Sequence, residues 1–102
     1  MRLIRLPGVD ADIIALSSYI AQNDAAAAEQ FQRACKTTFA RLAETPHIGV
    51  ERIFGEAELA SLRMWFVEGF EKHLIFYRVL DDAVEIVRVL HAARDLNDAL
   101  GH

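Results

Sequence analysis

The residues best suited to chemistry in this chain follow its last apolar run, where His91 is followed by Arg94 and Asp95. The imidazole of a histidine changes charge near neutral pH, so His91 is the best candidate for a general acid or base. Arg63, which alternates with Trp65 along a predicted strand, presents a guanidinium suited to phosphate or carboxylate oxygens. These residue types indicate acid–base chemistry next to a bound anion.

Each of these residues also has a structural explanation. A histidine at the end of a strand is more often structural than catalytic, and Arg63 alone is equally well explained as a solvated surface residue. Arg94 and Asp95 fit a small surface network, or the cap of a final helical turn. The catalytic and structural interpretations both stay open at this point.

No cofactor or metal site is predicted, because the chain has no HExxH, CxxC, GxGxxG or P-loop spacing. Cys35 is the single cysteine, which excludes an intramolecular disulfide and a cysteine-based zinc site. Its helical spacing between Phe31 and Phe39 indicates a buried apolar thiol rather than a nucleophile. His73, beside Lys72, is expected to be an exposed strand residue.

The strongest structural pattern is a β-hairpin over residues 72–95. Its two strands are rich in Val, Ile, Leu, Phe and Tyr and are predicted at Leu74 to Leu80 and Val84 to Leu90. A two-residue turn at Asp81-Asp82 would oppose Arg78 with Glu85 and give the arginine an ion-pair partner. A three-residue turn would abolish that pair, and because Asp-Asp is a weaker turn signal than Asp-Gly, the register stays open.

The elements before the hairpin follow from apolar periodicity and from Pro and Gly breaks. They are a strand at residues 2–6, helices from about Val9 to Gln22 and Ala25 to Ala43, and a strand from Ser61 to Val67. The segment from Pro46 to Ala60 is predicted to be a loop with a short helical turn near Glu56 to Ala60.

This order predicts a single α+β domain spanning residues 1–102. An N-terminal strand is followed by an antiparallel helical hairpin and then by a three-stranded antiparallel meander. One face of the sheet can pack against the helices, whereas apolar side chains on the other face would form an exposed hydrophobic patch on a monomer. We therefore expect a bound partner.

The formal net charge of −4, from 11 Lys and Arg against 15 Asp and Glu, argues against a nucleic-acid-binding surface. The sequence has no apolar run of the roughly 18 residues that a membrane span requires, and its N-terminus lacks a signal-peptide core. We expect a cytoplasmic protein with no membrane contact.

The hairpin and the segments before it together resemble one known family. The residues that carry the resemblance are LIFYRV, VEIVRVLH and AARD in the hairpin, the pattern DI..LSSYIA from Asp12 to Ala21, ETPHIG at the end of the second helix, and LR opening the next strand. Nearly the whole chain is thus similar to the RelE/ParE toxin superfamily, and within it to the ParE branch.

The resemblance implies the toxin of a type II toxin–antitoxin system, held inactive by a ParD-like antitoxin. Such antitoxins are usually ribbon-helix-helix DNA-binding proteins, so the toxin would contact DNA only indirectly. The antitoxin tail would lie over the helical hairpin and along the sheet. The candidate antitoxin contacts are Ile13, Leu16, Ile20, Phe31, Trp65 and Tyr77.

The two branches of the superfamily imply different activities. ParE-like members are described as non-enzymatic inhibitors of DNA gyrase, whereas RelE-like members are ribosome-dependent mRNA endonucleases. Trp65 stands where the nuclease branch would have a second basic residue, His73 stands where it often has arginine, and no tyrosine follows Asp95. We therefore expect a gyrase inhibitor.

The alternative is an mRNA endonuclease with a reduced catalytic set. That set would comprise Arg63, Arg78, His91 and Arg94. A third hypothesis is an interaction domain that has lost its toxicity.

Overall fold

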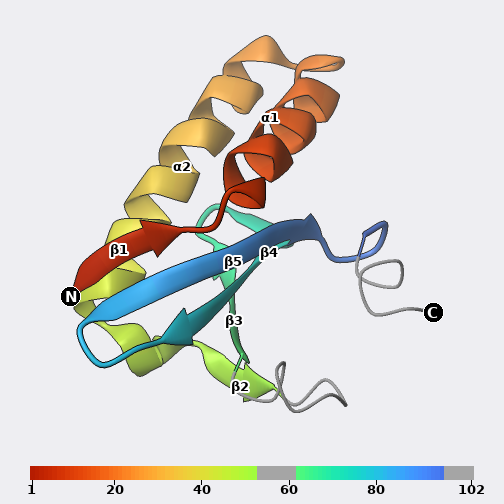
Figure 1. The fold of residues 1–102 in the computed structure, drawn as a ribbon. Coiled ribbons are helices and arrows are strands. Elements are labelled where there is room, and N and C mark those ends of the chain that lie inside the picture. The colour runs from red at the N-terminus through yellow and green to blue at the C-terminus, as the bar shows by residue number, and fades with distance from the viewer. Residues whose placement is uncertain (53–61, 96–102) are drawn as a thin grey trace.

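Two helices cover one face of a mixed five-stranded sheet in the computed structural model, which describes residues 1–52 and 62–95 (Figure 1). The elements are β1 (Arg2–Arg5), α1 (Gly8–Ala21), α2 (Ala25–Glu44), the 3₁₀ helix η1 (Pro46–Ile48), β2 (Val50–Arg52), β3 (Leu62–Val67), β4 (Phe70–Val79) and β5 (Ala83–His91). The α+β class and the helical hairpin followed by antiparallel strands are confirmed. The helical turn predicted near Glu56 to Ala60 lies outside the described residues.

The strand order is β1-β5-β4-β3-β2. Strand β1 runs parallel to β5, and the remaining neighbours are antiparallel. The register of β4 on β5 opposes Arg78 with Glu85, and Nη1 of the arginine lies 3.2 Å from Oε1 of the glutamate. The two-residue turn at Asp81-Asp82 and the predicted ion pair are therefore confirmed.

The prediction of a loop from Pro46 to Ala60 was wrong over its first part, because η1 begins at Pro46 and β2 begins at Val50. The cause is a contact from β4, where the Tyr77 hydroxyl accepts the Gly49 N–H at 2.9 Å and donates to the Pro46 carbonyl at 2.7 Å. These bonds hold the segment against the sheet, so that Val50 pairs with Met64 on β3. Sequence periodicity gives no signal for a strand of three residues held by a distant tyrosine.

The core lies between the helices and the sheet. Its fully or almost fully buried side chains include Val9 and Leu16 of α1, Phe31, Cys35, Phe39 and Leu42 of α2, and Val67, Ile75, Tyr77, Val84, Ile86 and Val89 of the sheet. A second cluster, Leu62, Phe76 and Leu90, lies on the opposite face of the sheet. The chain thus places apolar residues on both faces of its central strands, as the alternation predicts.

Both helices begin and end within one residue of the positions predicted from the sequence. Asp24 is the N-cap of α2, and its side chain accepts the Ala27 N–H at 3.0 Å. Within residues 1–52 and 62–95, neither helix is long and apolar enough to cross a bilayer.

Candidate functional site

The second half of β5 has no strand beside it on its β1 side. Strand β1 pairs with β5 only from Ala83 to Ile86, because Pro7 follows β1 and α1 begins at Gly8. Helix α1 packs beside the remainder of β5. The backbone from Arg88 to His91 is therefore a sheet edge, whose N–H groups need other partners.

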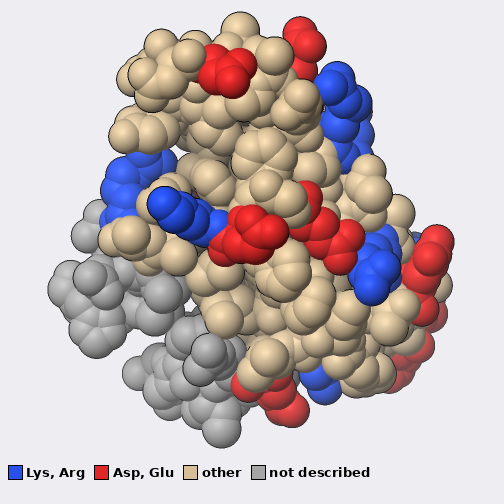
Figure 2. Space-filling view, turned by 180° about the vertical axis from the view of Figure 1, so that it is seen from behind, with Lys and Arg blue, Asp and Glu red and all other residues tan. Residues whose placement is uncertain are grey.

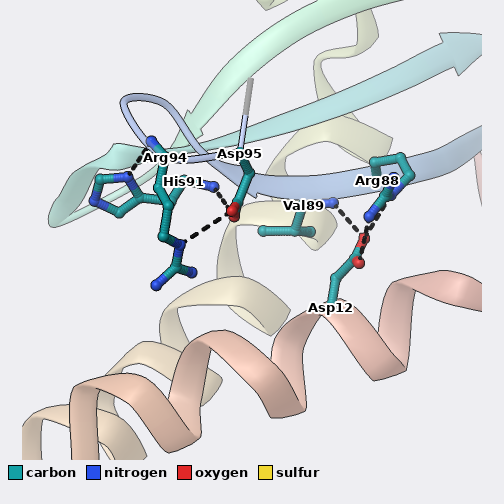
Figure 3. A network of polar contacts seen from close by, with 6 residues as sticks. All are labelled: Asp12, Arg88, Val89, His91, Arg94 and Asp95. Atoms are coloured by element: carbon teal, nitrogen blue, oxygen red, sulfur yellow. Dashed lines mark hydrogen bonds and ion pairs between the residues drawn. The ribbon is translucent and has the colours of Figure 1, made fainter. Parts of the chain in front are cut away.

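Asp12 on α1 supplies one of these partners (Figure 3). Its carboxylate accepts hydrogen bonds from Arg88 Nε at 3.1 Å and Arg88 Nη2 at 2.9 Å, and a further one from the Val89 N–H at 3.1 Å. The bonds to Asp12 raise the pKa of the Arg88 guanidinium. An extra residue in β5 between Ile86 and Arg88 interrupts the pairing with β4 here, and such bulges redirect side chains next to functional sites.

Asp95 supplies the other partner, from the turn that follows β5 (Figure 3). Its carboxylate accepts the His91 N–H at 3.0 Å and Arg94 Nε at 3.0 Å, and its own N–H donates to the His91 carbonyl at 2.8 Å. The hydrogen bond from Arg94 holds the pKa of the Asp95 carboxyl below its usual value. Two carboxylates thus cap successive outward N–H groups of the β5 edge.

Between these caps lies a groove of about 390 Å³, bounded by α1 on one side and by β5 and its turn on the other. Asp12, Ala15 and Leu16 line the helix side, and Arg88, Arg94 and Asp95 line the strand side. The Arg94 guanidinium lies over the Tyr19 ring, with Cζ 4.6 Å from the ring centroid. The groove combines apolar side chains with paired charges, a combination that can hold an extended peptide.

The comparison with known families decides what kind of chain carries this groove. A family model described as the ParE toxin of the type II toxin–antitoxin system, parDE, matches residues 3–96. The chain belongs to the ParE toxin family. The match spans both helices, the groove and the whole β4–β5 hairpin, so the predicted resemblance is confirmed. No curated protein matches the chain.

Membership makes this ParE-family chain the toxin of a type II toxin–antitoxin system, and it implies a ParD antitoxin as partner. The groove between α1 and β5 lies within the residues that the family model matches.

The four residues of the nuclease alternative do not converge in this ParE-family toxin. Arg78 lies at the turn end of the hairpin, opposite Glu85, whereas His91 lies at the far end of β5. His91 lies six positions beyond Glu85 along β5, which is roughly 20 Å at the usual rise per residue. Arg94 lies near His91 in the turn after β5, but a catalytic set of all four is not assembled.

Arg63 lies on β3, a strand that holds none of the other three residues. The expectation that it is a solvated surface residue was wrong. Its Nη1 donates to the Gly49 carbonyl at 2.8 Å, and 21% of its side chain is exposed. Arg63 shares its face of β3 with Trp65 and Val67, and the latter belongs to the core beneath the helices. Its guanidinium therefore serves to hold the segment before β2.

Most described arginines of this toxin already have a carboxylate partner. The pairs are Arg2 with Asp82, Arg5 with Asp10, Arg41 with Glu68, Arg63 with Glu51, Arg78 with Glu85, Arg88 with Asp12, and Arg94 with Asp95. Figure 2 shows basic and acidic side chains side by side on the described part of one face, rather than a continuous basic surface. Such pairing leaves little positive charge to attract RNA phosphates.

The six candidate antitoxin contacts divide into two groups. Phe31 and Tyr77 are fully buried and Leu16 is 3% exposed, so these three belong to the core, although Leu16 also lines the groove. The partly buried members, which retain surface, are Ile13, Ile20 and Trp65. Apolar spacing identifies residues that lie on the same face of an element, but it does not tell whether that face is buried in the core or open to a partner. The predicted set therefore contains core residues together with surface ones.

Sequence reasoning missed several residues of the groove. Asp12 and Arg88 carry no recognisable spacing, because 76 residues separate them in the chain. Tyr19, which contacts Arg94 at the groove, lies off the core stripe of α1 and is 54% exposed. The available signal was that α1 holds more apolar residues than one buried face requires.

Two further side chains with chemical potential, Cys35 and His73, lie in or against the core. Burial raises the pKa of the Cys35 thiol to about 12, which agrees with an inert core cysteine. The prediction that His73 is exposed was wrong, because its ring lies 4.8 Å from that of Phe31. Within residues 1–52 and 62–95, no three His, Cys, Asp or Glu side chains are grouped closely enough to hold a metal ion.

Proposed function

We propose that this toxin is neutralised by a ParD-like ribbon-helix-helix antitoxin whose extended tail lies in the groove between α1 and β5. The observation that carries the proposal is the groove itself, where Ala15 and Leu16 of α1 and Val89 of β5 offer apolar contacts between paired charges. Ile13, Ile20 and the more exposed Tyr19 offer further apolar contacts along that helix. A tail that folds on binding is suited to covering such an elongated surface.

Trp65 extends the proposed contact surface to β3. Its ring is partly buried, and its Nε1 donates to Glu68 Oε2 at 3.4 Å. A tail that continues from α1 across the helical hairpin would reach this position. Contact with DNA would be made only by the antitoxin.

The proposed action of the free toxin is inhibition of DNA gyrase in the cytoplasm by protein contact, without catalysis. Two observations support it over mRNA cleavage. Arg78 and His91 of the nuclease alternative lie at opposite ends of the hairpin with Arg63 on another strand, and seven described arginines are paired with carboxylates. An enzyme that binds and cleaves RNA needs convergent, unpaired cations.

The proposed target is tested by adding the purified toxin to a gyrase supercoiling assay and to ribosomes programmed with mRNA. We expect loss of supercoiling and intact mRNA, and supercoiling should be restored when the antitoxin from the adjacent reading frame is added. Cleavage of mRNA without an effect on gyrase would establish the nuclease alternative instead.

The proposed antitoxin surface is tested with Ala15→Asp, which places a charge on an exposed position of α1 that lines the groove, without entering the core. Affinity for the antitoxin tail should fall at least about tenfold, the effect of 1.4 kcal/mol. Thr37→Asp, on the exposed side of α2, is the matched control and should bind as the wild type does. Equal affinity of both variants would place the tail elsewhere.

A further inference from the structure

A second groove lies on the opposite side of α1, between α1 and α2. Its volume is about 330 Å³, and the side chains that line it are Arg5 of β1, Asp10, Ile13 and Ile14 of α1, and Gln32 and Lys36 of α2. An α-helix turns by about 100° per residue, so Asp10 and Ile14 share one side of α1, while Asp12, in the first groove, lies roughly 160° away. The two grooves are therefore separate surfaces on either side of one helix.

The apolar part of the second groove is left unused by folding. Ile14 is 64% exposed, more than any other large apolar side chain that the structure describes. Ile13 packs partly against the core and keeps some of its surface. An aliphatic side chain of a partner that lies on this surface removes it from water, and that burial favours binding. The groove thus offers an apolar contact that only a partner can complete.

The polar part of the second groove has an excess of positive charge. Arg5 Nη1 lies 3.0 Å from Asp10 Oδ1, and Arg5 Cζ lies 5.2 Å from the centroid of the Phe39 ring, so this guanidinium is held beside the groove. Lys36 is exposed and has no carboxylate partner within residues 1–52 and 62–95. Two cations and one carboxylate therefore line the groove, although the whole chain carries a net charge of −4.

A single unpaired lysine beside exposed isoleucine surface selects one kind of partner. A nucleic-acid backbone would need several unpaired cations, whereas seven described arginines are paired with carboxylates. A protein segment that carries Asp or Glu close to an aliphatic residue matches both the charge and the apolar contact. The chemistry of this groove therefore fits a protein rather than a nucleic acid.

We infer that the free toxin holds its target protein in the groove between α1 and α2, through a segment that lays an aliphatic side chain on Ile14 and a carboxylate on Lys36. The inference rests on the proposed function, in which the antitoxin tail is anchored on the other side of α1 and the target is gyrase. A tail that continues across the helical hairpin toward Trp65 passes over this second groove. A bound antitoxin therefore excludes the target.

The target surface is tested with Ile14→Asp and Lys36→Glu, through growth arrest on expression and the toxin concentration that halves gyrase supercoiling. That concentration should rise at least about tenfold in each variant, because the partner's carboxylate then meets a like charge. Affinity for the full-length antitoxin should stay within about threefold, as for surface substitutions outside the main contact, which also shows that the variants are folded. Ala11→Asp and Arg33→Glu are the matched controls. They make the same charge changes at exposed positions of the same helices, line neither groove and should remain toxic.

The carboxylate of the partner is tested separately with Lys36→Gln. Binding of the toxin to immobilised gyrase should weaken as salt is raised, because an exposed ion pair is screened. This salt dependence should be smaller in Lys36→Gln than in the wild type. Equal salt dependence would overturn the carboxylate assigned to the partner.

Ala15→Asp, in the first groove, should show the opposite pattern, with weakened antitoxin binding and undiminished growth arrest. The inference is overturned if Ile14→Asp and Lys36→Glu arrest growth as the wild type does. It is also overturned if they weaken antitoxin binding as much as Ala15→Asp does, because the tail would then occupy the groove, or if they dissociate a dimer of the free toxin, because a second copy would. If the wild type arrests growth without affecting gyrase, the proposed target fails, and growth arrest by the same variants still decides the surface.

Discussion

Asp12 on α1 binds Arg88 on β5 through two hydrogen bonds, although 76 residues separate them in the chain. The same carboxylate caps the Val89 N–H, and only 13% of the Asp12 side chain is exposed. This contact fastens α1 to the half of β5 that lacks a neighbouring strand. It also fixes the width of the groove in which the antitoxin is proposed to bind.

Removing this contact should weaken the fold. Asp12→Ala leaves the Val89 N–H and the Arg88 guanidinium without their acceptor, so we expect a loss of about 1–3 kcal/mol in the free energy of unfolding. Urea unfolding followed by tryptophan fluorescence measures it. Asp10→Ala is the matched control, since its ion pair with Arg5 is exposed and should contribute less than about 1 kcal/mol. Equal stability of the two variants would contradict the importance given to Asp12.

Gly49 should not tolerate a side chain. A Cβ at this position would overlap the Tyr77 hydroxyl and lie 2.9 Å from the Met64 carbonyl oxygen. Neither atom can shift easily, because the Tyr77 side chain is fully buried and the Met64 carbonyl belongs to the backbone of β3. Gly49→Ala is therefore expected to lose about 1–3 kcal/mol of stability, as overpacking usually does. Gly8→Ala is the control, because a Cβ there meets no atom within 4 Å. If Gly49→Ala is as stable as the wild type, η1 and β2 are held against the sheet less firmly than their contacts suggest.

Stability should decrease in mild acid because of His73. Burial lowers the pKa of His73 in the folded chain, so the unfolded chain binds the proton at a higher pH. The stabilisation is fully present above the unfolded pKa of about 6.5 and is lost as the pH falls toward the folded value. The free energy of unfolding in urea should thus be lower at about pH 5.5 than at about pH 7.5. His73→Phe should reduce this difference, and His47→Gln should retain it.

Cys35 should be unreactive while the chain is folded. Burial raises the pKa of its thiol to about 12, so almost no thiolate exists near neutral pH. A thiol reagent such as Ellman's should react only after urea is added. Cys35→Ser gives the background signal, and labelling of the folded toxin at the unfolded rate would refute the buried position.

Arg78 should be dispensable for toxicity. Arg78→Gln breaks the cross-strand pair with Glu85, which is worth about 0.2–1 kcal/mol. The residue lies at the hairpin end far from the groove, so growth arrest on expression should remain as strong as in the wild type. Glu85→Gln breaks the same pair and controls for stability. If Arg78→Gln alone abolishes toxicity, the nuclease alternative gains support.

Local pattern was enough to predict much of this fold. Helical spacing placed α1 and α2 within a residue of their observed ends, and Asp24 was recognisable as an N-cap. Alternation along the hairpin and a two-residue turn fixed the pairing of Arg78 with Glu85. These features depend on residues close together in the chain, whose geometry is set by backbone periodicity. The family signature lies in the same segments, which is why the ParE resemblance was also visible.

The site itself depended on tertiary structure. Periodicity groups residues by face but does not say which face meets the helices, and so Arg63 and His73 were expected on the surface. The parallel pairing of β1, the short β2, and the contact of Asp12 with Arg88 join segments that are distant in sequence. Such contacts form only when the core brings the segments together, because neither partner alone has a local preference for the other. The sequence by itself determined the family and the elements of this toxin, and only packing decided that its groove lies between α1 and the open half of β5.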